Sequence, residues 1–399
     1  MADDHTTDWR VVVLATLAGI VAAMQIGKVA PAVPAIRAEV GMSLVTAGWM
    51  LSIFNLMAAL LALVAGILAD RLVIRWVIAA AVAMLLAGAL AGALAGGSLS
   101  LIASRAVAGL GLVGIAVAAP RMIVGASAPR DRSLTLGVWS IYMPTGIALG
   151  MLLTPLLLGW LQWRGVWLAN AGLLSLFLLL FLAAVRGGGR TGSRHHHSGG
   201  VADLRQVTHV PGPWLLGAIF ACYTVPFFAM MSWFPVFLIE TQGLATASAG
   251  AFGALVVAAN GIGCLASAWL LHHGARRWRL QFIAFGVMAL CAVGVFSSLV
   301  GPAWKTPLAF LFSAVGGLIP SATLSAASLH APDTRLVATV NGIIVQGANT
   351  GSLFGPPLMA MAVGLAGGWI GTWWLTLLFT GAGIGLVLWL RAVEARLQS

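Results

Sequence analysis

Residues 11–36 read VVVLATLAGIVAAMQIGKVAPAVPAI, and Lys28 is the one charged side chain among them. An apolar run of about 20 residues is long enough to cross the hydrocarbon core of a bilayer as a helix. A lysine near the bilayer centre costs roughly 2.5–3.5 kcal/mol on insertion scales, so its presence needs a reason. Lys28 either belongs to a polar site inside the protein or snorkels to the headgroups from the outer half of its helix.

The rest of the chain is similarly apolar. Of its 399 residues, 60% are hydrophobic and 8% are charged, and the mean hydropathy is +1.01. Soluble domains carry about 25% charged residues, so this composition predicts a polytopic membrane protein. The first ten residues, MADDHTTDWR, lack the basic region of a cleaved signal, and we expect the first helix to be retained. The three cysteines, Cys222, Cys264 and Cys291, lie in apolar stretches and predict no disulfide framework.

Twelve apolar runs of spanning length predict twelve transmembrane helices in an all-α fold. They cover residues 11–36, 44–69, 73–95, 98–122, 134–158, 165–186, 213–239, 246–271, 279–300, 306–330, 336–364 and 369–391. A Gly-, Ser-, Arg- and His-rich stretch at 187–212 predicts a flexible cytoplasmic linker between two six-helix bundles, 1–186 and 213–399. We interpret the three histidines at 195–197 as part of this solvated linker and expect no metal site.

The basic residues predict the orientation. With both termini in the cytoplasm, only Arg37, Arg164 and Lys305 fall outside, and Lys28 and Arg105 fall within spans. All the other lysines and arginines lie on the cytoplasmic side, as the positive-inside rule requires. The net charge of +11 therefore indicates membrane topology and attraction to anionic lipid rather than binding of nucleic acid.

Three placed motifs indicate a family. GILADRLVIR, residues 66–75, resembles the G-x-L-a-D-r-x-G-r signature of the major facilitator superfamily, with Val73 where the family usually has glycine. RAVAGLGLVG, residues 105–114, resembles the R-x-x-x-G-x-G motif of helix four. GANTGSLFGPP at 347–357, with a looser counterpart GIALGMLLTP at 146–155, places small residues at intervals of four, which permits close helix packing. The residues expected to pack in this way are Gly66, Gly109, Gly146, Gly150, Gly347, Gly351, Gly355 and Pro356.

The resemblance implies a secondary transporter in which two bundles rock about a substrate site near the bilayer midplane. A more specific resemblance, carried by MSWFPVFLIETQGLATASAG at 231–250, is to cyanate permease-like and nitroimidazole-transporter-like members. The resemblance also implies that Asp70, Arg71 and Arg75 form a cytoplasmic gate that stabilises the outward-open state. For Arg105 it leaves open a conformational or coupling role, direct substrate contact, or hydrogen bonding to backbone carbonyls.

The charges within the spans favour an anionic substrate. Every Asp and Glu lies in a predicted loop, tail or helix end, so no acid neutralises Lys28 or Arg105. Gln25 and Lys28 stand three residues apart on one helix face, and Pro31 can loosen the backbone beyond them. We expect Lys28 to face a hydrated cavity whose partner is an anion.

The other candidates for substrate contact are neutral. They are Asn55, Tyr142, Tyr223, Trp233, Asn260, Asn341, Gln346 and Asn349. Each also has a structural interpretation, because polar side chains hold helices together at about 0.6 kcal/mol apiece and tryptophans populate membrane interfaces.

The sequence therefore predicts a secondary active or facilitative transporter for a small anionic organic solute, embedded in the bacterial inner membrane. We expect a functional monomer without a cofactor. The sequence does not determine which ion, if any, is coupled to transport, and a proton is one candidate. An efflux pump for drugs, siderophores or metabolites is the nearest alternative, and a non-transporting receptor on the same fold is another. An enzyme is disfavoured because the chain has no G-x-S-x-G, no H-E-x-x-H and no paired buried carboxylates.

Overall fold

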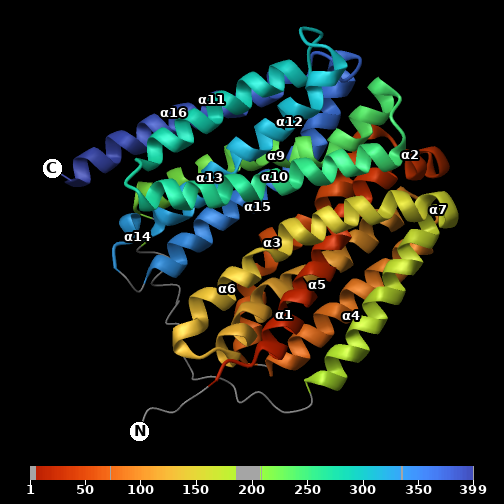
Figure 1. Cartoon of the computed structure of the whole chain (residues 1–399), viewed down its shortest axis with the longest axis horizontal. Helices are drawn as coiled ribbons and strands as arrows, with labels where there is room; N and C mark the ends of the chain where they lie inside the picture. Colours follow the sequence, from red (N-terminus) through yellow and green to blue (C-terminus); the bar gives the residue numbers. More distant parts are fainter. Residues whose placement is uncertain (1–5, 72, 186–206, 208, 334–335, 399) are drawn as a thin grey trace. The chain divides into compact units, whose positions relative to one another are not determined.

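The computed structural model describes residues 6–71, 73–185, 207, 209–333 and 336–398 (Figure 1). The side chains of residues 59, 61–71, 133, 338 and 396–398 are outside this description. Most of the linker predicted at 187–212 also lies outside it. The described residues form helices and the turns between them, without a strand.

The chain divides into two compact units. The first contains α1 (Trp9–Gly27), α2 (Val29–Val40), α3 (Leu44–Arg71), α4 (Ile74–Ala93), α5 (Ser98–Ala126), the 3-10 turn η1 (Pro129–Asp131), α6 (Arg132–Ser140) and α7 (Tyr142–Ala184). The second contains α9 (Pro211–Gln242), α10 (Thr246–His272), α11 (Arg277–Val295), α12 (Pro302–Gly316), α13 (Leu318–Ser325), α14 (Ala327–His330), α15 (Val337–Ala366) and α16 (Trp373–Gln398). Residues Ala245–Ala254, which include the start of α10, cluster with the first unit.

Nine helical segments among the described residues are long and apolar enough to cross a membrane. One of them, Leu134–Ala184, has 51 residues. As a straight helix it would be about 75 Å long, more than twice the roughly 30 Å hydrocarbon core. It is folded instead, and Figure 1 shows α7 turning back on itself. The total of twelve spans and the cytoplasmic position of both termini remain predictions.

The bend in α7 is centred on Gln162, which has φ 54° and ψ 175° inside an otherwise helical segment. A non-glycine residue in this region is strained by about 1–3 kcal/mol, so surrounding contacts have to hold it. The next two residues supply them: the Trp163 indole N–H donates to Glu39 Oε2 at 2.5 Å, and Arg164 pairs with Glu39 at 2.9 Å. Arg164 also donates to the carbonyls of Ala93 and Ala95 at the end of α4. This corner fixes where the second arm of α7 begins.

Glycines allow the main helix pairs within each unit to pack closely. In the first unit α1 packs on α7, where Gly146 lies against the carbonyl of Ile20 and a Cβ on Gly150 would stand 2.7 Å from the carbonyl oxygen of Met24. In the second unit α9 packs on α15, where Gly347 lies against the backbone of Gly217 and Gly355 against that of Val225. Small residues therefore permit close packing of α1 on α7 in the first unit and of α9 on α15 in the second.

Candidate functional site

A local break in the first spanning segment positions Lys28. α1 ends at Gly27 and α2 begins at Val29. Pro31 has no N–H, so the carbonyl of Gly27 loses its usual partner four residues on. The break is slight, because Lys28 keeps φ −62° and ψ −24° and its N–H still donates to Met24 at 3.0 Å. The chain therefore continues across the bilayer and carries Lys28 at the point where its helical hydrogen bonding is weakest.

Lys28 is buried, with 1% of the residue exposed, and its side-chain partners described below belong to the first unit. Its ammonium donates to Gln25 Oε1 at 2.6 Å and lies 4.5 Å from the ring centre of Trp167 in α7. The i, i+3 pairing of Gln25 with Lys28 is as expected from their spacing. That Lys28 faces a hydrated cavity remains a prediction.

Gln25 connects this lysine to α7. Its Nε2 donates to Asn170 Oδ1 at 2.9 Å and to the carbonyl of Val21 at 3.4 Å. Asn170 Nδ2 in turn donates to the carbonyl of Val166 at 3.2 Å. These bonds fix the Gln25 amide with its oxygen toward Lys28, because an amide oxygen accepts while its nitrogen only donates.

Arg105 brings a second buried cation from α5, with 2% of the residue exposed. Its Nη1 donates to the backbone oxygen of Gln25 at 2.7 Å, and its guanidinium carbon lies 4.6 Å from the ring centre of Phe54. The Nε and Nη2 atoms are buried without a hydrogen-bond partner among the described residues. Arg105 is close enough to act electrostatically on Lys28. We call Gln25, Lys28, Arg105 and Asn170 the cationic cluster.

The cationic cluster lacks a compensating negative charge. Arg130–Asp131, Arg164–Glu39 and His330–Glu394 are ion pairs among the described residues, and no described carboxylate pairs with Lys28 or Arg105. Burying each ion costs several kcal/mol, of which a desolvated cation–π contact returns about 2 kcal/mol or more and a hydrogen bond to a charged group about 1.5–3 kcal/mol, but neither contact neutralises the charge. An anion between the two cations would supply the missing interaction and partners for the free Arg105 donors.

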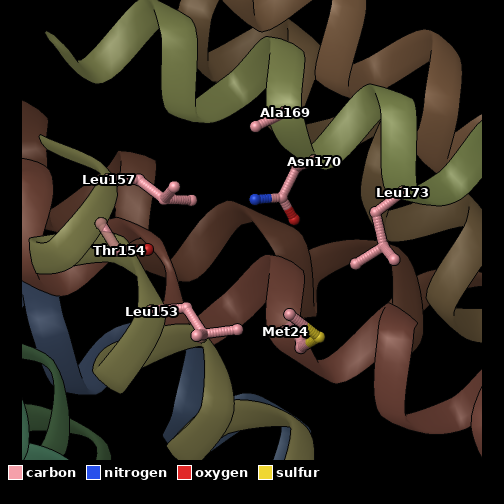
Figure 2. Close-up of a pocket in the computed structure, with 8 residues that line it drawn as sticks. Met24, Leu153, Thr154, Leu157, Ala169, Asn170 and Leu173 are labelled. Carbon is pink, nitrogen blue, oxygen red and sulfur yellow. The ribbon is translucent and has the colours of Figure 1, made fainter. Parts of the chain in front are cut away.

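A small cavity of about 80 Å³ adjoins the cluster, lined by Met24, Gly150, Leu153, Thr154, Leu157, Ala169, Asn170 and Leu173. Figure 2 shows the Asn170 amide projecting into it between Leu157 and Leu173. Ligand pockets typically measure about 300–1,000 Å³, so this cavity is too small for most organic solutes. Asn170 is the member of the cationic cluster that lines this cavity, and Lys28 and Arg105 are not among its lining residues.

The remaining candidates in the first unit, Asn55 and Tyr142, lie in different surroundings. Tyr142 stacks on Trp139 with ring centres 4.1 Å apart, and both rings lie against Gly19. Gly19 precedes Lys28 by two and a half helical turns of α1. Asn55 is buried in α3 next to Phe54, the residue whose ring faces Arg105. The structure thus places Asn55 in the helix segment that faces the cluster, and Tyr142 in a separate aromatic contact.

The second unit holds a separate polar contact. Asn260 Nδ2 donates to the Tyr223 hydroxyl at 2.7 Å and to the carbonyl of Ser313 at 3.1 Å, joining α10 to α9 and α12. The Trp233 indole donates to the carbonyl of Pro356 at 2.8 Å, which gives this residue a role in holding α9 to α15.

The polar residues of α15 are spread along one helix. Asn341 Oδ1 is buried without a partner among the described residues. The backbone oxygens of Gln346 and Asn349 accept from Thr350 and Ser352. These bonds are local to the helix, and the part of these three residues in substrate contact remains a prediction.

The predicted gate is described only in part. The side chains of Gly66, Asp70 and Arg71 lie outside the described residues. Arg75 Nη2 donates to the carbonyl of Leu182 at 3.0 Å, near the end of α7, where a cation also interacts favourably with the helix dipole. Gly109, of the helix-four motif, lies against the carbonyl of Phe54, so it serves the close packing of α3 on α5.

Comparisons with known proteins identify the family. The family model described as Major Facilitator Superfamily matches residues 15–347. The chain belongs to the major facilitator superfamily, and it is a multi-pass membrane transporter rather than an enzyme. None of the curated proteins compared with the chain matches it.

Solved structures of transporters share the fold at low sequence identity. A bacterial homologue of the human lysosomal transporter Spinster, in an inward-facing and unoccupied conformation, has a TM-score of 0.77 and 16% identity over 99% of this chain and 96% of its own. A D-xylose–proton symporter has a TM-score of 0.74 and 15% identity over 96% and 97% of the two chains. A point mutant of the nucleoside transporter NupG has a TM-score of 0.78 and 12% identity over 96% and 99%. At these identities the likeness extends to the fold alone.

Proposed function

We propose that this protein is a secondary transporter that moves a small anionic organic solute across the bacterial inner membrane by alternating access. One observation carries the proposal: Lys28 and Arg105 are buried together, 1% and 2% exposed, with no carboxylate paired to either among the described residues. Buried charges in membrane proteins pair with one another, with backbone carbonyls or with a functional ligand. Two cations cannot pair with each other, and the Gln25 carbonyl takes only one of the Arg105 donors and carries no net charge. An anionic ligand is therefore the partner that completes the cluster.

The helix break gives this ligand a way to act on the conformation. Lys28 sits between α1 and α2, and a Cβ on Gly150 would stand 2.8 Å from the Lys28 backbone nitrogen. An anion drawn between Lys28 and Arg105 therefore pulls on α1 where it contacts α5 and α7. The enclosed cluster needs such a movement to admit a solute, since the adjoining cavity is small.

A thermal-shift screen of the purified protein tests the proposal. We expect lactate, oxalate, benzoate or cyanate to raise the melting temperature, whereas the uncharged lactamide and adenine do not. An anion present at 100 times its Kd stabilises by about 2.7 kcal/mol, which corresponds to roughly 5–11 °C for a unit of 150–250 residues. Lys28→Ala should abolish this shift.

The matched control is Lys305→Ala. Lys305 is also buried, and its ammonium donates to the carbonyl of Ser297 at 3.2 Å in the second unit, outside the cluster. This variant should keep the anion-induced shift. Stabilisation by the uncharged compounds alone, or an equal anion shift in Lys28→Ala and the native protein, would refute an anion site at the cluster.

We also propose that Asp70 acts in the cytoplasmic gate that the family resemblance implies. Asp70→Asn keeps the size of the side chain and removes its charge, so the gate loses its attraction to the neighbouring arginines. We expect slower solute uptake in proteoliposomes with an unchanged amount of protein in the membrane. Uptake kinetics identical to those of the native protein would show that Asp70 has no such role.

A further inference from the structure

The Lys28 ammonium has more hydrogen-bond donors than it has described acceptors around it. An ammonium has three N–H donors, and the described neighbourhood offers Gln25 Oε1 and the face of the Trp167 ring. Gln25 cannot turn to offer more, because its Nε2 is held by Asn170 and Val21. A neutral amine has one N–H donor fewer than an ammonium and no charge to stabilise. The surroundings of Lys28 therefore suit a neutral lysine when no anion is bound.

Arg105 is the charged group next to Lys28, since both cations bond to Gln25: Lys28 to its side-chain oxygen and Arg105 to its backbone oxygen. α1 packs against α2, α4, α5, α6 and α7, and their other described charged side chains are engaged or lie toward helix ends: Arg37, Glu39, Arg75, Arg121, Arg132 and Arg164. Arg105 keeps its charge at all physiological pH values. Of the two cations, only the lysine can release a proton under these conditions.

We propose, on the basis of the proposed function, that Lys28 couples transport to protons by holding one proton for each anion carried. On loading, the free amine takes a proton from water and the resulting ammonium binds the anion beside Arg105. On release, the anion departs and the ammonium returns its proton to water on the other side. The empty carrier resets with a neutral Lys28, and Arg105 stays charged throughout as the fixed attraction for the next anion.

The enclosure of the cluster makes the two binding events interdependent. A proton on Lys28 strengthens anion binding, and by linkage the anion strengthens proton binding by the same factor. Asn170 contributes as a positioning residue, since it orients Gln25 Oε1 toward Lys28. The coupling thus needs no membrane-embedded carboxylate.

The test compares two transport modes in proteoliposomes, using the radiolabelled anion that gives the largest thermal shift among lactate, oxalate, benzoate and cyanate. In the native protein a pH gradient should drive accumulation, and preloaded vesicles should exchange anion for anion at equal pH. Lys28→Arg keeps a permanent cation that cannot release its proton, so the ratio of gradient-driven accumulation to exchange should fall at least about fivefold relative to the native protein, whatever the exchange rate of the variant. Lys305→Arg, the matched control, should retain both modes. An undiminished ratio of gradient-driven accumulation to exchange in Lys28→Arg would overturn the proposal.

A second measurement keeps the inference testable if Lys28→Arg proves inactive. Adding the same anion to native protein in weakly buffered detergent solution should cause uptake of about one proton per anion bound, because binding and protonation are linked. Anion binding without proton uptake would overturn the coupling role and leave the proposed function intact. Absence of any anion binding to the native protein would overturn the proposed function and this inference together.

Discussion

Replacing Arg105 with glutamine is expected to weaken anion binding by about 30-fold or more. Removing one member of a buried, hydrogen-bonded charge pair typically costs 2–5 kcal/mol, and about 1.4 kcal/mol is a factor of ten. The melting temperature of the unliganded protein should fall less than this loss of binding free energy would suggest. Arg105 loses its bond to the Gln25 carbonyl, but two unpartnered buried donors and an uncompensated charge disappear with it. Titrating the anion while recording the melting temperature gives both the affinity and the stability of the unliganded protein from one set of samples.

Arg164→Gln is the matched control for Arg105→Gln. Arg164 likewise lies over an aromatic ring, 4.3 Å from the centre of the Trp163 ring, and donates to the carbonyls of Ala93 and Ala95. It is paired with Glu39 at a partly exposed corner, so its loss should lower stability modestly and leave anion binding unchanged. A similar loss of affinity in both variants would show that Arg105 acts only by holding the unit together.

Replacing Gly27 with valine is expected to lower the melting temperature more than any other single change considered. A Cβ at Gly27 would collide with the backbone carbonyl of Ile147, and backbone cannot move aside as a flexible side chain can. Overpacking typically costs about 1–3 kcal/mol, and a collision with backbone belongs at the upper end; about 3 kcal/mol corresponds to roughly 6–12 °C for a unit of 150–250 residues. Intrinsic tryptophan fluorescence during heating measures the shift.

Gly172→Val separates this collision from the intrinsic cost of valine in a helix. Gly172 lies in α7, and a Cβ there would meet no atom within 4 Å. Its melting temperature should stay near that of the native protein. If both valine variants melted alike, the close contact of α1 with α7 at the Lys28 break would not exist as described.

Hydropathy and spacing predicted the elements of this fold that depend on local sequence. The long apolar segments follow directly from runs such as residues 11–36, and the glycines at intervals of four in α7 and α15 lie in helix contacts. The pairing of Gln25 with Lys28 was also predictable, because residues three apart share a helix face.

The rest of the cluster depends on contacts between distant parts of the chain. Asn170 is one polar residue in an apolar helix, and its bond to Gln25 spans 145 positions. Trp167 and Phe54 have no local feature that distinguishes them from other buried aromatic residues, yet they face the two cations. The enclosure of Lys28 likewise results from the packing of α1, α5 and α7. Periodicity within one helix carries no information about such neighbours. The sequence therefore indicated charged side chains in the interior without indicating which residues surround them.

Anomalous diffraction from crystals soaked in bromide shows whether an anion binds between Lys28 and Arg105. Bromide is a monovalent anion small enough to enter a tight site, and its position can be assigned without knowing the physiological solute. We expect a bromide peak within contact distance of Lys28 Nζ and the Nη2 of Arg105. Bromide bound only at the protein surface would show that the two cations do not form an anion site.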